Sequence, residues 1–382
     1  MLGIKIDFEK RIFGFDLLRA FAIFFVIHGH GRHLLNSTLF EGFPWFRLPH
    51  GVDIFFVLSG FLIGYSFIVN ANRTNNKLPL SKSSNFWKRS VLRILPNYYL
   101  ILFLNYFLVN GGILNGSTDQ FSIWRFITFT QNLFYPFYDF FWESWSLSAQ
   151  VWFYLLFPIL IMVLVEKFKL KYVIPAISLL FILSSIVYRF SISSLDYDSF
   201  WWDVSFRKVV VSRMDCVFFG VIAAWFRFYF KDYWMKYAKP LFLIGVLLFI
   251  FAAYLPKEVN SLYNKVFFLS ISPIYISLWF PLIDRLKDTK TILSKLITCF
   301  SVLSYAMYLL NLMVIQIIDK HYSDVLLNHA TLKYLSYWAI TVFLSYLLYV
   351  LFENPVSTYG NRIFNTTKMM YKRIGQAENN RF

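Results

Sequence analysis

Charged residues and cysteine are scarce in this chain of 382 residues. Asp, Glu, Lys and Arg make up only 15% of it, whereas a soluble protein of ordinary composition carries about 25%. That deficit excludes an ordinary soluble globular protein. The two cysteines, Cys216 and Cys299, stand in separate apolar stretches. Their spacing is typical of neither a disulfide framework nor a zinc site, and we expect no bound metal.

Long apolar runs take the place of the missing charge. Hydrophobic residues make up 58% of the chain and aromatic residues 22%, and the runs lack the short alternating segments of a membrane β-barrel. We therefore predict an all-α integral membrane protein that crosses the bilayer about ten times. The predicted spans cover residues 14–35, 51–69, 91–110, 145–165, 173–190, 209–226, 240–255, 266–283, 297–318 and 334–352.

The excess of basic residues follows the arrangement of the predicted spans. The chain holds 37 Lys and Arg against 21 Asp and Glu, a formal net charge of +16. Most of the basic residues lie in alternate segments between the predicted spans and at the two ends of the chain. The positive-inside rule then predicts an even number of spans with both termini in the cytoplasm. Because the sequence shows no soluble basic domain, we expect no nucleic-acid partner.

One membrane domain accounts for nearly the whole chain. We expect it to cover residues 1–355, followed by a short basic cytoplasmic tail at 356–382. The first apolar run is too long for the hydrophobic region of a signal peptide and lacks an obvious cleavage site, so we expect it to remain as the first span. For the aromatic-rich stretch 111–144 we expect interfacial or re-entrant structure, or else a short extra helical hairpin.

The first predicted span carries ionisable residues that lipid-facing helices lack. Arg19 and His30 are eleven residues apart, so on a helix they share one face, about 20° apart in rotation and about 16 Å apart along the axis. Asp16 lies one turn before Arg19 on the same stripe. Each group is costly in lipid, which indicates a functional or a pairing role. His28 faces another direction, and with His33 the histidines do not converge on a regular helix, which argues against a metal site.

The second predicted span begins with an acidic residue. Asp53 stands at its outer entrance and needs a cationic partner, such as His30 or an arginine. Ser59 and Gly60 interrupt the middle of the same span. Small residues such as Gly60 and Gly64 are typical of closely packed membrane helices.

Two arginines lie in register where the third predicted span begins. Arg89 and Arg93 are four residues apart, so they lie on one face of a helix at the cytoplasmic edge of the membrane. Guanidinium groups offer planar, multidentate donors that suit phosphate groups. The alternative is that both only anchor the helix at the interface, with their side chains extending toward the headgroups.

Polar residues gather where the fourth predicted span begins. Glu143, Ser146, Ser148 and Gln150 lie within two turns of each other. They either line a cavity or cap the N-terminus of the helix.

The sixth predicted span contains a further pair of opposite charges. Arg213 and Asp215 are two residues apart, which is poor geometry for an ion pair on one helix. We therefore expect each of them to pair with a side chain of another helix.

Together these elements resemble the acyltransferase-3 family of membrane acyltransferases. The resemblance covers the first six predicted spans and the end of the last one, and the order and spacing of its motifs make it specific. The motifs read FDLLRAFAIFFVIHGH (15–30), GVDIFFVLSGFLIG (51–64), KRSVLRILP (88–96), SWSLSAQVWFYLLFP (144–158), SRMDCVFFG (212–220) and ENP (353–355). One residue departs from the family pattern: Gln150 stands where the family has a glutamate, which keeps the hydrogen-bonding shape but removes the negative charge.

The resemblance implies a donor and an acceptor. An acyl group, usually acetyl, would come from cytoplasmic acyl-CoA and pass to a hydroxyl of an envelope polysaccharide or a lipid-linked glycan, in the inner (plasma) membrane of a bacterium. Arg89 and Arg93 would then bind the phosphates of acetyl-CoA, the acyl donor. Ser148, Gln150, Arg213 and Asp215 fall within the family's motifs and are further candidate functional residues.

The resemblance also suggests roles for the first two spans. We assign His30 as general base on the acceptor hydroxyl or as transient acyl carrier. Arg19 would orient the substrate or stabilise developing charge. Asp16 or Asp53 would hold a basic partner in place.

Two other classes of function compete with an enzyme. A secondary transporter of an anionic or lipid-linked solute could line its path with Arg19, His30 and Asp53, but it would favour inverted repeats and paired broken helices, and the sequence shows neither. A sensor or scaffold would use the same intramembrane charges as structural pairs. Intramembrane charge alone marks a functional site without naming the function.

Overall fold

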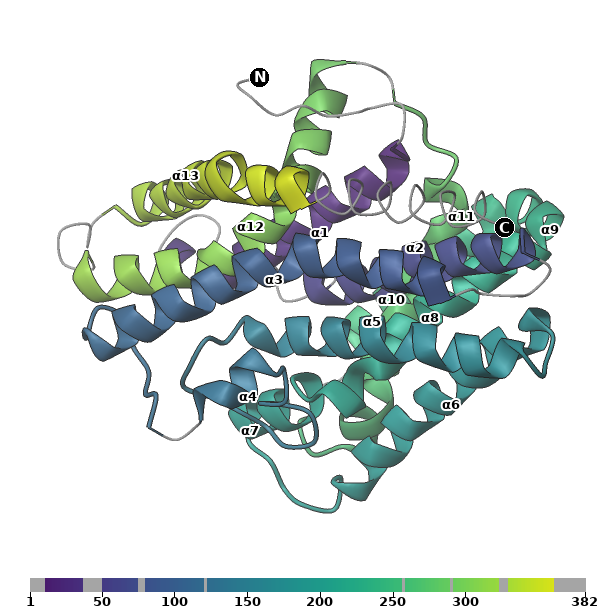
Figure 1. Cartoon of the computed structure of the whole chain (residues 1–382). Helices are drawn as coiled ribbons and strands as arrows, with labels where there is room; N and C mark the ends of the chain where they lie inside the picture. The colour runs from purple at the N-terminus through teal and green to yellow at the C-terminus, as the bar shows by residue number, and fades with distance from the viewer. Residues whose placement is uncertain are drawn as a thin grey trace, which may run out of the picture.

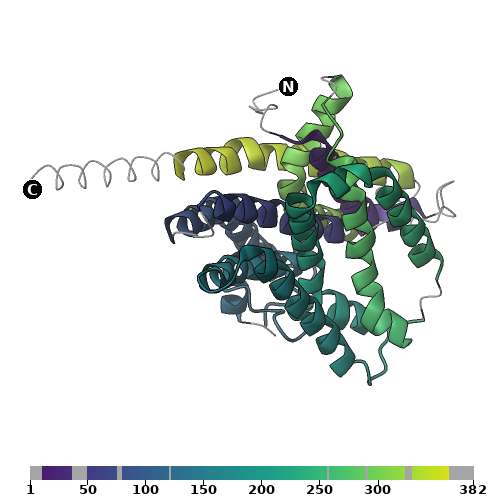
Figure 2. The same cartoon turned by 90° about the vertical axis from the view of Figure 1, so that its right-hand side faces the viewer.

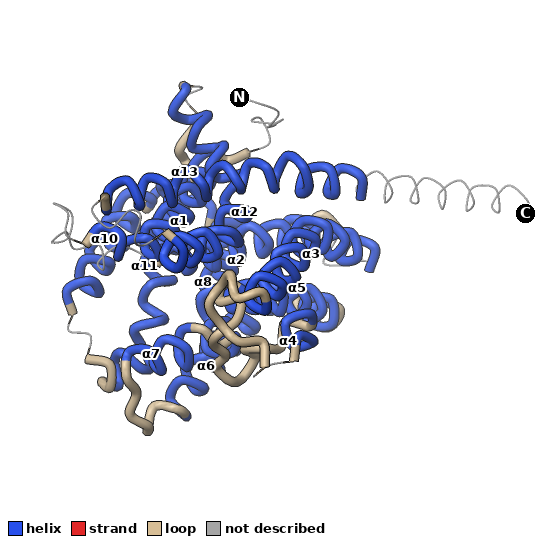
Figure 3. Tube along the Cα trace, turned by 90° about the vertical axis from the view of Figure 1, so that its left-hand side faces the viewer, coloured by secondary structure: helices blue, strands red, loops and turns tan. Residues whose placement is uncertain are grey.

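The described part of the protein consists of helices and the loops that connect them. The computed structural model describes residues 11–36, 50–74, 80–119, 122–255, 258–288, 291–322 and 329–360. No strand occurs among these residues, and in Figure 3 the described trace is all helix and loop. The predicted all-α, polytopic fold class is therefore confirmed.

Eight helices in the described ranges are long and apolar enough to cross a membrane. The bounds of the helices that contain them are α1 Phe13–Gly31, α2 Gly51–Asn72, α3 Leu80–Asn110, α5 Ser144–Val165, α6 Leu170–Ser191, α11 Phe268–Ile283, α12 Ile292–His321 and α13 Ala330–Leu348. Short helical turns extend α1, α11 and α13. The final helix continues to Gly360, so most of the predicted tail lies outside the described residues.

The two remaining predicted spans differ from regular membrane helices. The seventh corresponds to α10, Ala238–Tyr254, which is only 17 residues long. The sixth corresponds to α8, Val210–Tyr229, which follows α7, Ser199–Trp202, and a π-helical turn across a bend of 58°. Each predicted span thus has a helix. Among the described residues, the helices long and apolar enough to cross a membrane number eight, or nine if the bent pair is one span.

A side chain from a distant loop stabilises the break before α8. The Asn132 amide donates hydrogen bonds to the carbonyls of Lys208, at 2.7 Å, and Trp145, at 2.9 Å. The backbone N–H of Val210 in turn donates to the Asn132 carbonyl at 2.9 Å. Backbone groups released by a broken helix need such partners when they are buried away from water.

The aromatic-rich stretch before α5 is mostly irregular. Its described part contains one short helix, α4, Ile123–Ile127, and Figure 3 shows the rest as loop beside α4 and α5. The Tyr98 hydroxyl of α3 donates to the Phe126 carbonyl at 2.9 Å, and the Tyr98 ring lies 4.4 Å from the Phe129 ring. The described residues of this stretch therefore pack on α3 and contain no extra helical hairpin.

Helix α8 packs most extensively against α2 and α6, and α1 packs against α12. Figure 1 shows α2, α3 and α5 running across the molecule, with α6 below them, and both Figures 1 and 2 place α13 along the upper edge. A six-residue helix, α9, Lys231–Lys236, joins α8 to α10. In this arrangement α1, α2, α3, α5 and α12 surround several of the predicted site residues, among them Arg19, Arg89, Arg93 and Gln150.

Glycines allow the close contact between α2 and α8. A Cβ added at Gly60 would lie 1.9 Å from the Val217 carbonyl oxygen, and one added at Gly220 would lie 2.0 Å from the Val57 carbonyl oxygen. Neither position can accept a side chain unless the helices separate. The close-packing interpretation of Gly60 is therefore confirmed.

We expect Gly60→Ala to destabilise the protein by about 1–3 kcal/mol, because the added methyl group forces α2 and α8 apart. Thermal unfolding of the purified protein in detergent would measure the loss. Gly29→Ala on α1 is the matched control, since nothing lies within 4 Å of its added Cβ. Equal melting temperatures for the two variants would contradict the close-contact role of Gly60.

Candidate active site

Asp16, near the start of α1, is hydrogen-bonded to α12. The Asp16 carboxylate accepts hydrogen bonds from Arg11 Nε and from the Ser301 hydroxyl, both at 2.7 Å. Arg19 Nη1 lies 3.6 Å from Asp16 Oδ1, so the predicted neighbourhood of Asp16 and Arg19 is confirmed. Asp16 therefore holds basic side chains and α12 in place, and its side chain is only 3% exposed.

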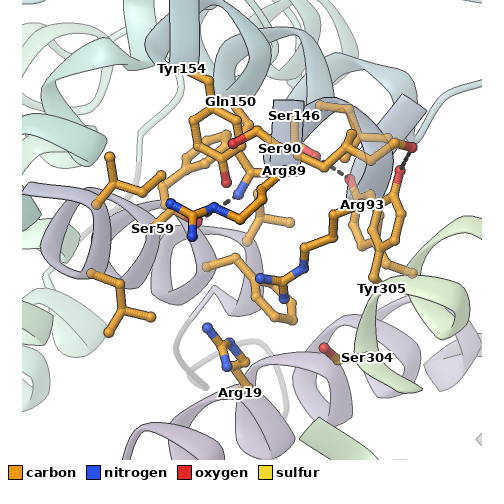
Figure 4. A pocket seen from close by; sticks show the side chains of 18 of the residues that line it. Arg19, Ser59, Arg89, Ser90, Arg93, Ser146, Gln150, Tyr154, Ser304 and Tyr305 are labelled. Carbon is orange, nitrogen blue, oxygen red and sulfur yellow. Dashed lines mark hydrogen bonds between the residues drawn. The ribbon is translucent and has the colours of Figure 1, made fainter. Parts of the chain in front are cut away.

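A cavity of about 270 Å³ lies between α1, α2, α3, α5 and α12 (Figure 4). Its walls combine aromatic and aliphatic side chains with a set of polar ones. The polar lining residues are Arg19, Ser59, Arg89, Ser90, Arg93, Ser146, Gln150, Tyr154, Ser304, Tyr305 and Tyr308.

Three guanidinium groups face this cavity from two helices. Arg19 comes from α1, and Arg89 and Arg93 come from successive turns of α3. The described lining includes no carboxylate. Outside the lining, the Asp16 carboxylate lies 3.6 Å from Arg19, and the Glu353 carboxylate interacts electrostatically with Arg93. Guanidinium groups that face a cavity with no carboxylate in its described lining suit an anionic ligand. The sequence predicted these residues on two helices but not that the helices meet. In the structure all three residues line the same cavity.

Gln150 and Ser148 have different positions although both belong to α5. The Gln150 amide donates a hydrogen bond to the Ser59 hydroxyl at 2.6 Å and lines the cavity. The Ser148 hydroxyl instead accepts from Gln131 at 2.6 Å and donates to the Ser144 carbonyl at 3.1 Å. Ser148 is thus buried in the contact with the preceding loop, while the neutral Gln150 leaves the cavity without negative charge.

Ser146 and Tyr308 line the cavity together. Their hydroxyl oxygens are 2.7 Å apart, and the Tyr308 hydroxyl lies 3.0 Å from the Glu143 carbonyl oxygen, to which it donates. Glu143 is 3% exposed, and its Oε1 has no hydrogen-bond partner among the described residues. Burial raises the pKa of the Glu143 carboxyl to about 8.

His30 does not line the cavity but contacts α12 at Asn311, one helical turn beyond Tyr308. Its Nδ1 is 2.5 Å from Asn311 Oδ1, and the Asn311 amide donates to the Tyr308 carbonyl at 2.6 Å. Tyr308 therefore contacts both: its side chain lines the cavity, and its carbonyl accepts from the residue that contacts His30. Sequence reasoning missed Asn311, because a single polar residue in an apolar span carries no motif of its own.

The other two histidines of this region have partners elsewhere. His28 Nδ1 is 2.7 Å from the Tyr334 hydroxyl, and His33 Nε2 is 2.9 Å from Asp319. Over the described ranges, no group of three His, Cys, Asp or Glu side chains is placed to hold a metal ion.

Charged residues cluster at the bend before α8. Asp203 forms an ion pair with Arg207, and Lys208 Nζ lies 2.8 Å from Asp203 Oδ2. The sequence reading placed these residues before the sixth span and did not select them. The four-residue spacing of Asp203 and Arg207 was the signal available.

Asp53 lies in a buried ion pair and not in the cavity. Its carboxylate accepts from Arg213 of α8 and from Ser272 of α11. The expected cationic partner is therefore an arginine and not His30. Asp215, two residues further along α8, pairs with Arg189 of α6 at 2.8 Å. Both charges of the sixth span thus pair with other helices, as expected, and they link α8 to α2 and α6.

A family model for the acyltransferase domain matches residues 12–350. The chain belongs to the acyltransferase-3 family. The match includes α1, α3, α5 and α12, which supply the arginine-lined cavity, and family membership agrees with the apolar helices in making the chain an integral membrane protein.

Relatives of this acyltransferase-3 chain carry names that refer to O-acetyl transfer. SACOL0978 of Staphylococcus aureus (strain COL), provisionally named an O-acetyltransferase, is 25% identical over 391 residues, which cover 93% of this chain and 59% of the relative. The O-acetyltransferase OatA of Staphylococcus aureus (strain NCTC 8325 / PS 47) is 34% identical over 185 residues, 45% of this chain and 28% of the relative. The chain thus spans about three fifths of the length of SACOL0978. No solved structure matches it.

The buried pair of Asp53 and Arg213 allows a test of scaffold against catalysis. Asp53→Asn leaves the Arg213 charge uncompensated, and we expect a loss of about 3–5 kcal/mol in stability. Replacing both partners by apolar residues, Asp53→Leu with Arg213→Met, is expected to restore most of that stability. Thermal unfolding of the three proteins measures both effects.

Acyl transfer by the same variants separates the two roles of Asp53. If the carboxylate only holds α8 against α2, the restored double variant transfers acyl groups at a rate close to that of the unaltered protein. A stable double variant with no transfer would instead indicate a direct part for Asp53 or Arg213 in the reaction.

Proposed function

We propose that the chain is a membrane acyltransferase. It moves an acyl group, in the simplest case acetyl, from cytoplasmic acyl-CoA to a hydroxyl of an envelope polysaccharide or lipid-linked glycan in the bacterial inner (plasma) membrane. The observation that carries this proposal is the cavity toward which Arg19, Arg89 and Arg93 converge without a carboxylate in the described lining. Family membership and the O-acetyltransferase names of the relatives support the type of reaction.

The cavity chemistry suits a CoA thioester. CoA carries several phosphate charges, and guanidinium groups bind phosphate oxygens with two or more parallel hydrogen bonds. Arg89 and Arg93 lie in the first half of α3, at the end that the positive-inside rule assigns to the cytoplasm. The aromatic wall, which includes Phe55 and Phe86, offers an apolar surface to the uncharged part of the donor.

The acyl end of the donor would lie toward Ser146 and Tyr308. His30 is then placed beyond this end, about 16 Å along α1 from Arg19. As the acceptor hydroxyl attacks the thioester carbonyl, His30 takes the hydroxyl proton. The carbon–sulfur bond breaks as the new ester bond forms, and the CoA thiolate takes up the proton from the imidazolium. Arg19, which faces the cavity with Arg89 and Arg93, orients the donor.

We expect the double variant Arg89→Gln, Arg93→Gln to bind acyl-CoA at least about tenfold more weakly, since each hydrogen bond to a charged group contributes about 1.5–3 kcal/mol. Equilibrium binding of acetyl-CoA to the purified full chain would measure the change. Lys167→Gln is the matched control, because Lys167 is exposed and outside the cavity lining. An unchanged dissociation constant in the folded double variant would favour the anchoring role of the two arginines.

We expect His30→Ala to lower acyl transfer by about 10²–10⁴-fold, the usual contribution of a general base. The assay supplies labelled acetyl-CoA to membranes that contain the protein and envelope glycan, and follows label in the glycan. The amount of protein and its affinity for acetyl-CoA should stay the same, because His30 lies outside the cavity lining. Undiminished transfer by His30→Ala would rule out its role as base.

A further inference from the structure

The side chain of Asn311 on α12 has a single workable orientation. Asn311 is fully buried, and its Nδ2 lies 3.1 Å from the Met307 carbonyl oxygen and 2.6 Å from the Tyr308 carbonyl oxygen. Carbonyl oxygens only accept hydrogen bonds, so the end of the amide that faces them is the NH₂ group. The other end, Oδ1, is therefore the atom that faces His30.

This orientation determines which ring nitrogen of His30 carries the proton. Asn311 Oδ1 is 2.5 Å from His30 Nδ1, and an amide oxygen can only accept, so Nδ1 is the donor. A neutral imidazole carries one ring proton, and placing it on Nδ1 leaves Nε2 with a free lone pair. In the opposite tautomer two acceptors would face each other across the same short distance.

The oxygen of the Asn311 amide also accepts a second hydrogen bond. The Tyr337 hydroxyl donates to Asn311 Oδ1 at 3.5 Å. The Tyr337 ring is itself held against α1, because a Cβ added at Gly31 would lie 2.6 Å from its Cε1 atom. Both lone pairs of Oδ1 are then occupied, and α1, α12 and α13 all contribute to the position of His30.

We infer that Asn311 is a positioning residue that holds His30 in the Nδ1–H tautomer, so that Nε2 is the atom that takes the acceptor proton. The inference rests on the proposed function for the part that concerns catalysis. An amide suits this task within an apolar span better than a carboxylate. It accepts the Nδ1 hydrogen bond without adding a charge that would need its own partner in the membrane.

Nitrogen NMR of the full chain tests the tautomer directly. In protein labelled with ¹⁵N-histidine, we expect a pyrrole-type signal for His30 Nδ1 and a pyridine-type signal for Nε2, assigned by their disappearance in His30→Gln. Asn311→Leu removes the acceptor, and we expect the two signals to move toward each other or exchange. Acyl transfer should fall at least tenfold, with acetyl-CoA affinity unchanged.

Two further variants separate positioning from general loss of structure. Asn311→Asp keeps an acceptor at Nδ1 and should retain the Nδ1–H pattern even if it transfers slowly. Asn105→Leu on α3 is the matched control: Asn105 is also buried and donates to a helix carbonyl, that of Ile101, at 3.0 Å. It should leave the His30 signals as they are.

The possible outcomes distinguish the inference from the proposed function. A pyridine-type Nδ1 in the unaltered protein overturns the inference, as does an unchanged pattern in Asn311→Leu or an equal change in Asn105→Leu. A lost tautomer with full acyl transfer in Asn311→Leu overturns the catalytic part. If the tautomer follows Asn311 but His30→Ala transfers normally, the role of His30 in the proposed function fails, while the structural action of Asn311 stands.

Discussion

Charge within a membrane-spanning helix is the constraint on which this structure depends. A charged group in such a helix is costly unless it has an opposite charge beside it or faces a polar cavity. The described helices use both solutions. Asp53 and Asp215 lie in buried ion pairs between helices, whereas Arg19, Arg89 and Arg93 face one cavity. The paired charges form the scaffold, and the cavity-facing charges mark the site.

Helix α8 carries much of that scaffold. The close contact at Gly60 and Gly220 brings its backbone against α2, and its Arg213 and Asp215 side chains bind α2 and α6. A site works best when rigid elements hold its groups in place. Because α2 also forms a wall of the cavity, the packing of α8 holds that wall in place without α8 itself lining the cavity.

Tyr308 links the two halves of the proposed reaction. Its hydroxyl contacts Ser146 at the cavity, and its carbonyl accepts a hydrogen bond from Asn311, which contacts His30. The arginine-lined cavity and the imidazole thus contact α12 one helical turn apart, at Tyr308 and at Asn311. This arrangement suits a reaction in which a cytoplasmic donor and an acceptor on the other side of the membrane approach the same point from opposite directions.

The sequence alone determined where the helices lie and which residues share a face. Hydropathy and helical periodicity are local properties, so the apolar runs and the common stripe of Asp16, Arg19 and His30 could be read directly. The tertiary structure decided which helices meet. Whether Asp53 pairs with His30 or with Arg213 depends on packing between segments far apart in the chain, and so does the bend before α8, whose amide partner is 76 residues away. No local pattern encodes such distances, and for that reason Asn311 and the shared cavity became visible only in the fold.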